Sequence, residues 1–117
     1  MPKKQLGKRI FTYDEALTTF PLVRDLTSAA VRQIDALTAN LGSRDEMDSR
    51  RDEIEEAREQ IVRNWAREVT SIGCEVKGIW LVDWDSGDGY YCWQFPEAAI
   101  SFFHTYDEGF GGRIPIN

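Results

Sequence analysis

The residues of this chain that could do chemistry lie near its C-terminus. Cys92 and Glu97 precede the one histidine, His104, and a segment rich in acidic residues and glycine follows it. Imidazole, thiolate and carboxylate groups are the protein ligands of divalent metals such as zinc. A divalent metal held by His104, Cys92 and Glu97 is therefore one hypothesis for this cluster.

The same side chains fit two catalytic hypotheses and one structural interpretation. His104 with Glu97 could act as a general acid–base pair, and Cys92 beside His104 could act as a nucleophile pair. Against both, a single histidine on a strand is more often hydrogen-bonded within the fold. A cysteine between two aromatic residues is usually a small buried apolar group. The catalytic candidates are His104, Glu97 and Cys92, and the structural interpretation stays open beside them.

Arg113, which follows two glycines, is a candidate for binding an anion. Loop N–H groups beside its guanidinium would assist in holding the anion. We favour a different interpretation, in which Arg113 pairs with Asp107 or Glu108 and pins the C-terminal segment. Trp93 is a further ligand-binding candidate, together with these two acidic residues, although an indole here is better explained as part of a core or a dimer contact.

Three runs of apolar and aromatic residues predict the strands that position these groups. They cover residues 79–84, 90–95 and 100–106, and Gly, Pro, Asp or Ser residues bound them. Runs of this kind are typical of β-strands. Residues 85–89 tolerate positive φ and predict a hairpin turn between the first two strands. The simplest arrangement is a three-stranded antiparallel meander.

The register of this meander decides whether Cys92 and His104 meet. Side chains alternate across a strand, so a shift of one residue moves all of them to the opposite face. A three-residue connection between the second and third strands places Cys92 and His104 on one polar face, which Asp83 can share. A two- or four-residue connection would separate them. We favour the odd connection because it gathers the aromatic residues around Trp93 on the other face.

The first helical segment is predicted to be interrupted near its start. Thr12 followed by Glu15 is a capping-box signature. Pro21 lacks an N–H donor and disfavours helix at the residue before it. We therefore expect a short helix over residues 13–19, a kink or break, and then a longer helix. From Phe20 on, apolar residues recur in steps of three and four up to a stop signal, which is typical of a helix packed along another helix.

A second long helix is predicted from Ser43, where another capping box starts, to Ile72, with Gly73 at its end. The short turn at Gly42 makes the two long helices an antiparallel hairpin. The second helix would span roughly 43 Å, whereas a six-residue strand covers about 20 Å. Because the sheet cannot cover the whole hairpin, we expect a second copy of the chain to cover the rest in a homodimer.

These elements predict an α+β protein, in which a long antiparallel helical hairpin packs on a small three-stranded antiparallel β-meander. The 117 residues are expected to form a single domain. Its parts are a basic tail (1–11), the helical hairpin (12–72), the β-meander (73–106) and a Gly-rich C-terminal tail (107–117).

The overall charge bounds the partners that can be expected. A net charge of −6 argues against nucleic acid, because phosphate backbones require a positive surface. We interpret the basic residues at the N-terminus, Lys3, Lys4, Lys8 and Arg9, as a solvated end. No stretch approaches the ~20 apolar residues of a membrane helix, and no secretory signal is recognisable. Two cysteines in such a chain favour reduced thiols, so we expect a cytoplasmic protein without a disulfide.

Several strings in the sequence occur together in one known family. They are Thr12–Ala16 followed by Pro21, Gly73–Gly78, Val82-Asp83, Cys92-Trp93, Glu97, His104 and Asp107–Pro115. Over nearly the whole chain they resemble the uncharacterised family called domain of unknown function 2203, and the last string is the most specific. The resemblance implies a small cytosolic prokaryotic protein and brings no established activity. The chain departs from the family pattern in a shorter hairpin turn and at Pro96 and Phe103.

The function predicted from these observations is a small non-enzymatic binding or interaction module that acts as a homodimer. The alternative is a small metal- or anion-dependent, hydrolase-like enzyme with its site at Cys92, Glu97, His104 and Arg113. A divalent metal is the cofactor that this alternative implies. Convergence of these side chains on one open pocket would favour the enzyme, whereas saturation of His104 and Arg113 by local partners would favour the module.

Overall fold

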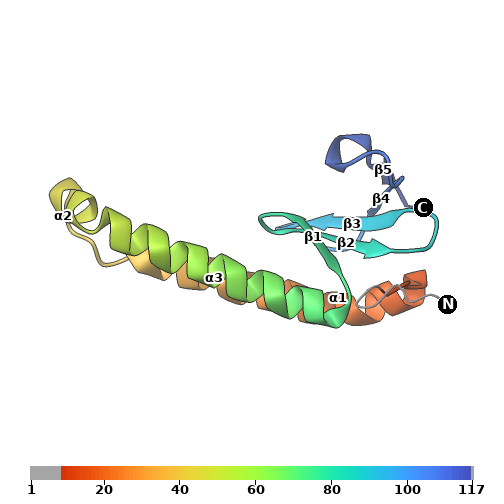
Figure 1. Ribbon diagram of the computed structural model, residues 1–117, viewed down its shortest axis with the longest axis horizontal. Helices are drawn as coiled ribbons and strands as arrows, with labels where there is room; N and C mark the ends of the chain where they lie inside the picture. The colour runs from red at the N-terminus through yellow and green to blue at the C-terminus, as the bar shows by residue number, and fades with distance from the viewer. Residues whose placement is uncertain (1–8, 117) are drawn as a thin grey trace.

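The computed structural model describes residues 9–116 as a long helical hairpin with a sheet across one end of it (Figure 1). The helices are α1 (Tyr13–Thr38), the short α2 (Arg44–Ser49) and α3 (Arg51–Ile72). The strands are β1 (Glu75–Gly78), β2 (Leu81–Asp85), β3 (Tyr90–Gln94), β4 (Phe102–His104) and β5 (Ile114–Pro115), with a 3-10 turn, η2 (Phe110–Gly112), before β5. The α+β class is therefore as predicted. None of the described helices is long and apolar enough to cross a membrane.

α1 is one continuous helix, and the predicted break at Pro21 is wrong. The predicted capping box forms: the Thr12 hydroxyl accepts the Glu15 N–H at 3.1 Å, and the Glu15 carboxylate accepts the Thr12 N–H at 2.9 Å. Pro21 lies inside the helix on its exposed side, while Phe20 and Val23 beside it are buried. Burial of that face offsets the backbone hydrogen bond that the proline removes.

The second helical segment is broken at Arg50, where the sequence predicted a single helix over residues 43–72. Ser43 caps α2, since its hydroxyl accepts the Glu46 N–H at 3.1 Å. Arg50 has φ −108° and ψ 12°, outside the helical range, and α3 starts directly after it. α3 ends at Ile72, as predicted. Gly73 terminates it with a left-handed φ of +110°, a conformation that favours glycine.

The sheet has five antiparallel strands in sequence order, where three were predicted. The predicted strands correspond to β2, β3 and β4. The two edge strands were missed: β1 pairs with β2, with Val76 opposite Val82, and β5 pairs with β4. The turn over residues 85–89 joins β2 to β3 as predicted, with Gly87 at a φ of +93°.

The register of the central strands puts Asp83, Cys92 and His104 on one face of the sheet. Asp83 lies opposite Cys92, and His104 lies opposite Tyr90, which precedes Cys92 by two positions on β3. Side chains alternate along a strand, so all of these residues project from the same side. The predicted shared face is confirmed, although the connection between β3 and β4 covers residues 95–101 and is not the predicted three-residue loop.

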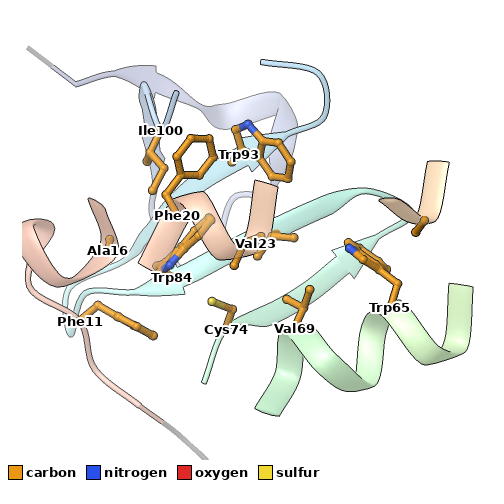
Figure 2. Packing of buried hydrophobic residues seen from close by; sticks show 12 residues of the cluster. Phe11, Ala16, Phe20, Val23, Trp65, Val69, Cys74, Trp84, Trp93 and Ile100 are labelled. Atoms are coloured by element: carbon orange, nitrogen blue, oxygen red, sulfur yellow. The ribbon is translucent and has the colours of Figure 1, made fainter. Parts of the chain in front are cut away.

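The opposite face of the sheet packs on the helices and forms the core (Figure 2). Phe20 of α1 contacts the buried rings of Trp84 and Trp93, with ring centroids 6.3 and 5.4 Å away. On α3, the buried Trp65 donates its indole N–H to the buried Thr27 hydroxyl of α1 at 2.8 Å. These contacts fix the strands against the hairpin and thereby fix the residues that project from the other face.

The sheet covers one end of the hairpin and leaves the other uncovered (Figure 1). The last buried residue of α1 is Ala30 and the first buried residue of α3 is Trp65, so none of residues 31–64 is fully buried. α1 ends at Thr38, within this uncovered part of the hairpin.

The described part of the predicted basic tail packs against the fold. Arg9 donates from Nη1 to the carbonyl oxygen of Ile72 at 3.1 Å. Phe11 is 1% exposed, and its N–H donates to the carbonyl oxygen of Asp85 at 2.7 Å. Outside the described residues lie Lys3, Lys4 and Lys8.

Candidate functional site

Asp83, Cys92 and His104 form a buried polar cluster on the sheet face that does not contact the helices. Asp83 and Cys92 have no exposed surface, and His104 is 4% exposed. A carboxylate oxygen, the thiol sulfur and a ring nitrogen of these residues lie within 4.8 Å of one another. Ionisable groups are rarely buried to this extent unless they are paired or coordinate a metal.

Both ring nitrogens of His104 face oxygen atoms. Nδ1 lies 2.8 Å from the carbonyl oxygen of Thr105, which can only accept, so Nδ1 carries a proton and donates it. Nε2 lies 2.8 Å from Oδ2 of Asp83, and the two atoms share one proton between imidazole and carboxylate. A backbone carbonyl behind Nδ1 is the usual partner of a metal-binding histidine, and it directs Nε2 toward the cluster.

The second carboxylate oxygen of Asp83 has no hydrogen-bond partner. Among residues 9–116, Oδ1 of Asp83 is the one buried side-chain nitrogen or oxygen atom that lacks a hydrogen-bond partner. Burial raises the pKa of this carboxyl, and the neighbouring Cys92 and His104 oppose the shift without cancelling it. A buried polar atom without a partner costs about 1–3 kcal/mol. A cation beside Oδ1 would supply the missing partner.

The Cys92 thiol is not poised to act as a nucleophile. Burial, reinforced by the carboxyl of Asp83, raises the pKa of Cys92 to about 12, although Arg113 opposes the shift. The thiol is therefore protonated at neutral pH, whereas nucleophilic attack requires the thiolate. His104 is not free to take the proton, because its two nitrogens are engaged by Thr105 and Asp83. The geometry does not support a Cys92–His104 nucleophile pair.

Glu97 and Arg113 form an ion pair beside the cluster, and the Arg113 guanidinium also interacts with the Cys92 thiol. The Arg113 nitrogens Nη1 and Nη2 lie 3.0 and 2.7 Å from the two carboxylate oxygens of Glu97. Burial alone would raise the pKa of Glu97, but hydrogen bonds from Arg113 and from the Gln94 N–H outweigh burial and lower it. Glu97 is thereby occupied, and it is not available to coordinate a metal or to act on His104.

Arg113 anchors the C-terminal segment, but its partner is not Asp107 or Glu108 as predicted. Its guanidinium carbon lies 4.1 Å from the ring centroid of Phe102 and 4.0 Å from that of Phe110. The guanidinium is thus held by two aromatic rings as well as by the ion pair with Glu97. This saturation by local partners does not support an anion site at Arg113.

A pocket of about 310 Å³ opens beside the cluster. Asp83 and His104 form part of its wall, and the fully buried Cys92 lies behind them, opposite Asp83. The remaining wall consists of Lys77, Leu81, Tyr106, Asp107, Glu108, Gly109 and Phe110. Two of the predicted ligand-binding residues, Asp107 and Glu108, therefore line this pocket.

Trp93, the remaining ligand-binding candidate, lies in the core on the other face of the sheet. Its side chain has no exposed surface, and its indole N–H donates to the carbonyl oxygen of Glu97 at 2.7 Å. It supports the loop that carries Glu97 and does not contact the pocket.

The sequence named Asp83 only as a possible member of the polar face, although the structure places it at the centre. The sequence did contain an indication of this role, because Asp83 is the acidic residue inside the apolar run of residues 79–84. An acidic residue at such a position has to be paired or coordinated. The two cysteines are free and buried, as expected, and Cys74 packs in the core away from this cluster.

The chain belongs to an established protein family. The model of the family described as "Uncharacterized conserved protein (DUF2203)" matches residues 9–116, which confirms the resemblance seen in the sequence motifs. No curated protein and no solved structure matches the chain. The family description gives no activity, so a function has to be inferred from the geometry of the cluster.

Proposed function

We propose that the protein is a binding module that holds a Zn²⁺ ion between Asp83, Cys92 and His104. The proposal rests on the buried Oδ1 of Asp83, which has no partner. The carboxylate of the same residue lies in a group of three donor atoms within 4.8 Å of one another. A zinc ion here would be held by a carboxylate oxygen of Asp83, the thiolate of Cys92 and an imidazole nitrogen of His104. It would therefore compensate the buried carboxylate, which has one oxygen without a partner.

The mixture of donor atoms selects zinc over magnesium and calcium. Magnesium and calcium prefer oxygen ligands, whereas zinc takes sulfur, nitrogen and oxygen together at about 2.0–2.3 Å. Three protein ligands would leave room for one further ligand on a zinc ion, and Asp83 and His104 line the adjacent pocket. Water or a small ligand can occupy that position. The carboxylates of Asp107 and Glu108 in the same wall favour the approach of a cation.

Binding of the ion requires the cluster to release protons. The Cys92 thiol, with a pKa of about 12, has to become a thiolate, and the shared hydrogen bond between Nε2 and Oδ2 has to open. The charge of the ion compensates the two buried anions that result. His104 keeps its orientation because Nδ1 continues to donate to Thr105. Since the thiol must be reduced, the proposal fits a reducing compartment such as the cytoplasm.

The geometry favours binding over catalysis. An enzyme built on Cys92, Glu97, His104 and Arg113 would need these side chains to converge on one pocket. Instead, Glu97 and Arg113 satisfy each other. The pocket beside Asp83 and His104 has room for a ligand on the ion. The thiol next to this pocket, Cys92, has a pKa of about 12 and is therefore not a nucleophile at neutral pH.

Metal titration of the untagged protein, stripped with chelator, tests the proposal. We expect one Zn²⁺ per chain by native mass spectrometry and calorimetry. Loss of one ligand in Cys92→Ser or His104→Gln should weaken binding by at least about 10-fold. Cys74→Ser is the matched control, because Cys74 is also a free, buried cysteine, 2% exposed. It should bind zinc like the natural protein.

Cobalt gives a second readout that depends on the thiolate. Co²⁺ in place of zinc should show thiolate-to-metal charge-transfer absorption that persists in Cys74→Ser and disappears in Cys92→Ser. The proposal is overturned if the natural protein binds no zinc at micromolar concentration, or if Cys74→Ser loses binding as severely as Cys92→Ser.

A further inference from the structure

A groove runs between α1 and α3 beyond the edge of the sheet. One hollow of about 240 Å³ lies where the hairpin meets the turn between β1 and β2, and another of about 260 Å³ lies farther toward α2. Arg58 lines both, so they are consecutive sections of one surface, which we call the hairpin groove. Its apolar lining residues are Val31, Ile34, Met47, Ile54, Val62, Ile79 and Trp80.

The fold itself does not cover the hairpin groove. Ile79 is 62% exposed and Met47 is 46% exposed. Figure 1 shows that the sheet lies over the other end of the hairpin, so α2 and the adjoining parts of α1 and α3 project beyond it. Contiguous apolar surface with charged residues at its rim is typical of a protein–protein contact.

The turn that presents Ile79 is held in an unfavourable backbone conformation. Trp80 has a φ of +63°, which is rare for a bulky residue. Its ring packs edge-on against Trp65 with centroids 4.8 Å apart, and its carbonyl oxygen accepts the Phe95 N–H at 3.0 Å. Conformations of this kind persist where the surroundings enforce them, and they concentrate at functional surfaces. Here the turn keeps the exposed Ile79 at the head of the groove.

Charges of both signs make the groove self-complementary. Asp35 of α1 and Arg58 of α3 both line it and are exposed. Within residues 9–116 neither takes part in an ion pair. In a two-fold contact the same surface of each chain meets its counterpart, so one acid and one base on it can pair twice across the interface. A strongly acidic or strongly basic partner would instead be matched by a groove of one sign.

We infer that a second copy of this chain occupies the hairpin groove, with Asp35 of each copy facing Arg58 of the other. Residues of both α1 and α3 line the groove, so two hairpins can pack along it as a four-helix arrangement. A standard contact takes about 800 Å² from each partner, roughly a tenth of the 7388 Å² that this chain exposes. The buried polar cluster of Asp83, Cys92 and His104 lies on the outer face of the sheet and does not take part in this contact.

Charge reversal tests this inference by sedimentation equilibrium. The natural protein should be a dimer at micromolar concentration. Arg58→Asp and Asp35→Arg each place like charges opposite one another, so each should raise the dimer dissociation constant by at least about 10-fold. An equimolar mixture of the two variants should form a heterodimer, because every cross-chain pair is again of opposite sign. The double variant Asp35→Arg/Arg58→Asp should regain the homodimer.

Arg63→Asp is the matched control for these variants. Arg63 is an exposed arginine of α3 that does not line either hollow, and its reversal should leave the dimer intact. The inference is overturned by a natural protein that stays monomeric, by dimers that survive both reversals, or by a mixture that stays monomeric. Helical circular dichroism of each variant shows whether the fold is retained, and all of the altered residues are exposed.

Discussion

Asp83 and Trp84 are neighbours on β2, and Cys92 and Trp93 are neighbours on β3. Because side chains alternate along a strand, Asp83 and Cys92 project from the outer face of the sheet, and Trp84 and Trp93 project from the helical face. All four side chains have no exposed surface. On the helical face, each indole N–H donates to an oxygen atom of the fold, at 2.9 and 2.7 Å. On the outer face, one oxygen of Asp83 has no partner. These four side chains are equally buried, so the two faces differ here in hydrogen bonding and not in burial.

The largest effect is expected on the helical face. Trp93→Ala removes a fully buried indole and leaves a cavity between the sheet and α1, which should cost about 3–5 kcal/mol of unfolding free energy. Chemical denaturation followed by circular dichroism measures the loss. Leu17→Ala on α1, where the side chain is 40% exposed, is the control and should cost less than about 1 kcal/mol. Equal losses in the two variants would contradict the described core.

An intermediate effect is expected at the ion pair that holds the C-terminal segment. Glu97→Gln weakens the bidentate contact with Arg113 and should cost about 1–2 kcal/mol at neutral pH. The pKa of Glu97 is lower in the folded protein than its ordinary value, so the ionised carboxylate contributes stability above that value. The contribution is lost as the pH falls through the folded pKa. The difference between the variant and the natural protein should therefore shrink below about pH 4.

The control for this pH dependence is an ion pair at the surface. Glu53 is also hydrogen-bonded to an arginine, Arg50, but the pair is exposed. Denaturation curves of Glu53→Gln and of the natural protein should coincide from acid to neutral pH. If instead Glu97→Gln and the natural protein differ equally at all pH values, the carboxylate of Glu97 is not the group that responds.

The smallest effect on stability is expected for Asp83→Asn on the outer face, although it should abolish tight zinc binding. The amide can donate to Nε2 of His104 and removes a buried acid, so the metal-free variant should lie within about 0.5 kcal/mol of the natural protein or above it. Asp85 provides the comparison, because its Oδ1 accepts the Gly87 N–H at 2.9 Å and the Tyr106 hydroxyl at 2.7 Å. Asp85→Asn should cost about 1 kcal/mol.

A comparison of these two aspartates in one experiment tests whether the unpartnered oxygen of Asp83 has a structural role. Both lie on β2, both are buried, and they point to the same side of the strand. Thermal unfolding of the metal-free variants measures the two costs side by side. If Asp83→Asn is as destabilising as Asp85→Asn, the unpartnered oxygen has a structural role and the case for the metal site is lost.

Local signals in the sequence predicted the parts of the fold that local interactions decide. The capping box of Thr12 and Glu15 and the left-handed Gly73 depend on residues within one helical turn, and both form as predicted. Continuity of α1 through Pro21 depends on burial of the neighbouring face against strands far along the chain. β1 was missed for the same reason, because the short segment Glu75–Gly78 gains its strand structure by pairing with β2.

The cluster was predictable only to the extent that strand alternation applies. Side-chain alternation along the two strands, with a connection of odd length, predicted Cys92 and His104 on one face, and the structure agrees. The pairing of Glu97 with Arg113 was missed, because both lie outside the predicted strands and no periodic rule relates two loop residues. The central position of Asp83 depends on the register between β2 and β3, which the sequence left open.

The strands β1 to β5 follow one another in space in the same order as in the chain. Each pairs with its sequence neighbour, so forming the sheet closes only short segments of chain, and the antiparallel helices α1 and α3 likewise meet across one connection. Contacts between sequence neighbours form rapidly because they cost little loop-closure entropy. The distant contacts are those that join the hairpin to the sheet, such as the hydrogen bond between Trp84 and Thr19. We therefore expect the helical hairpin and the sheet to form early during folding and to dock against each other late.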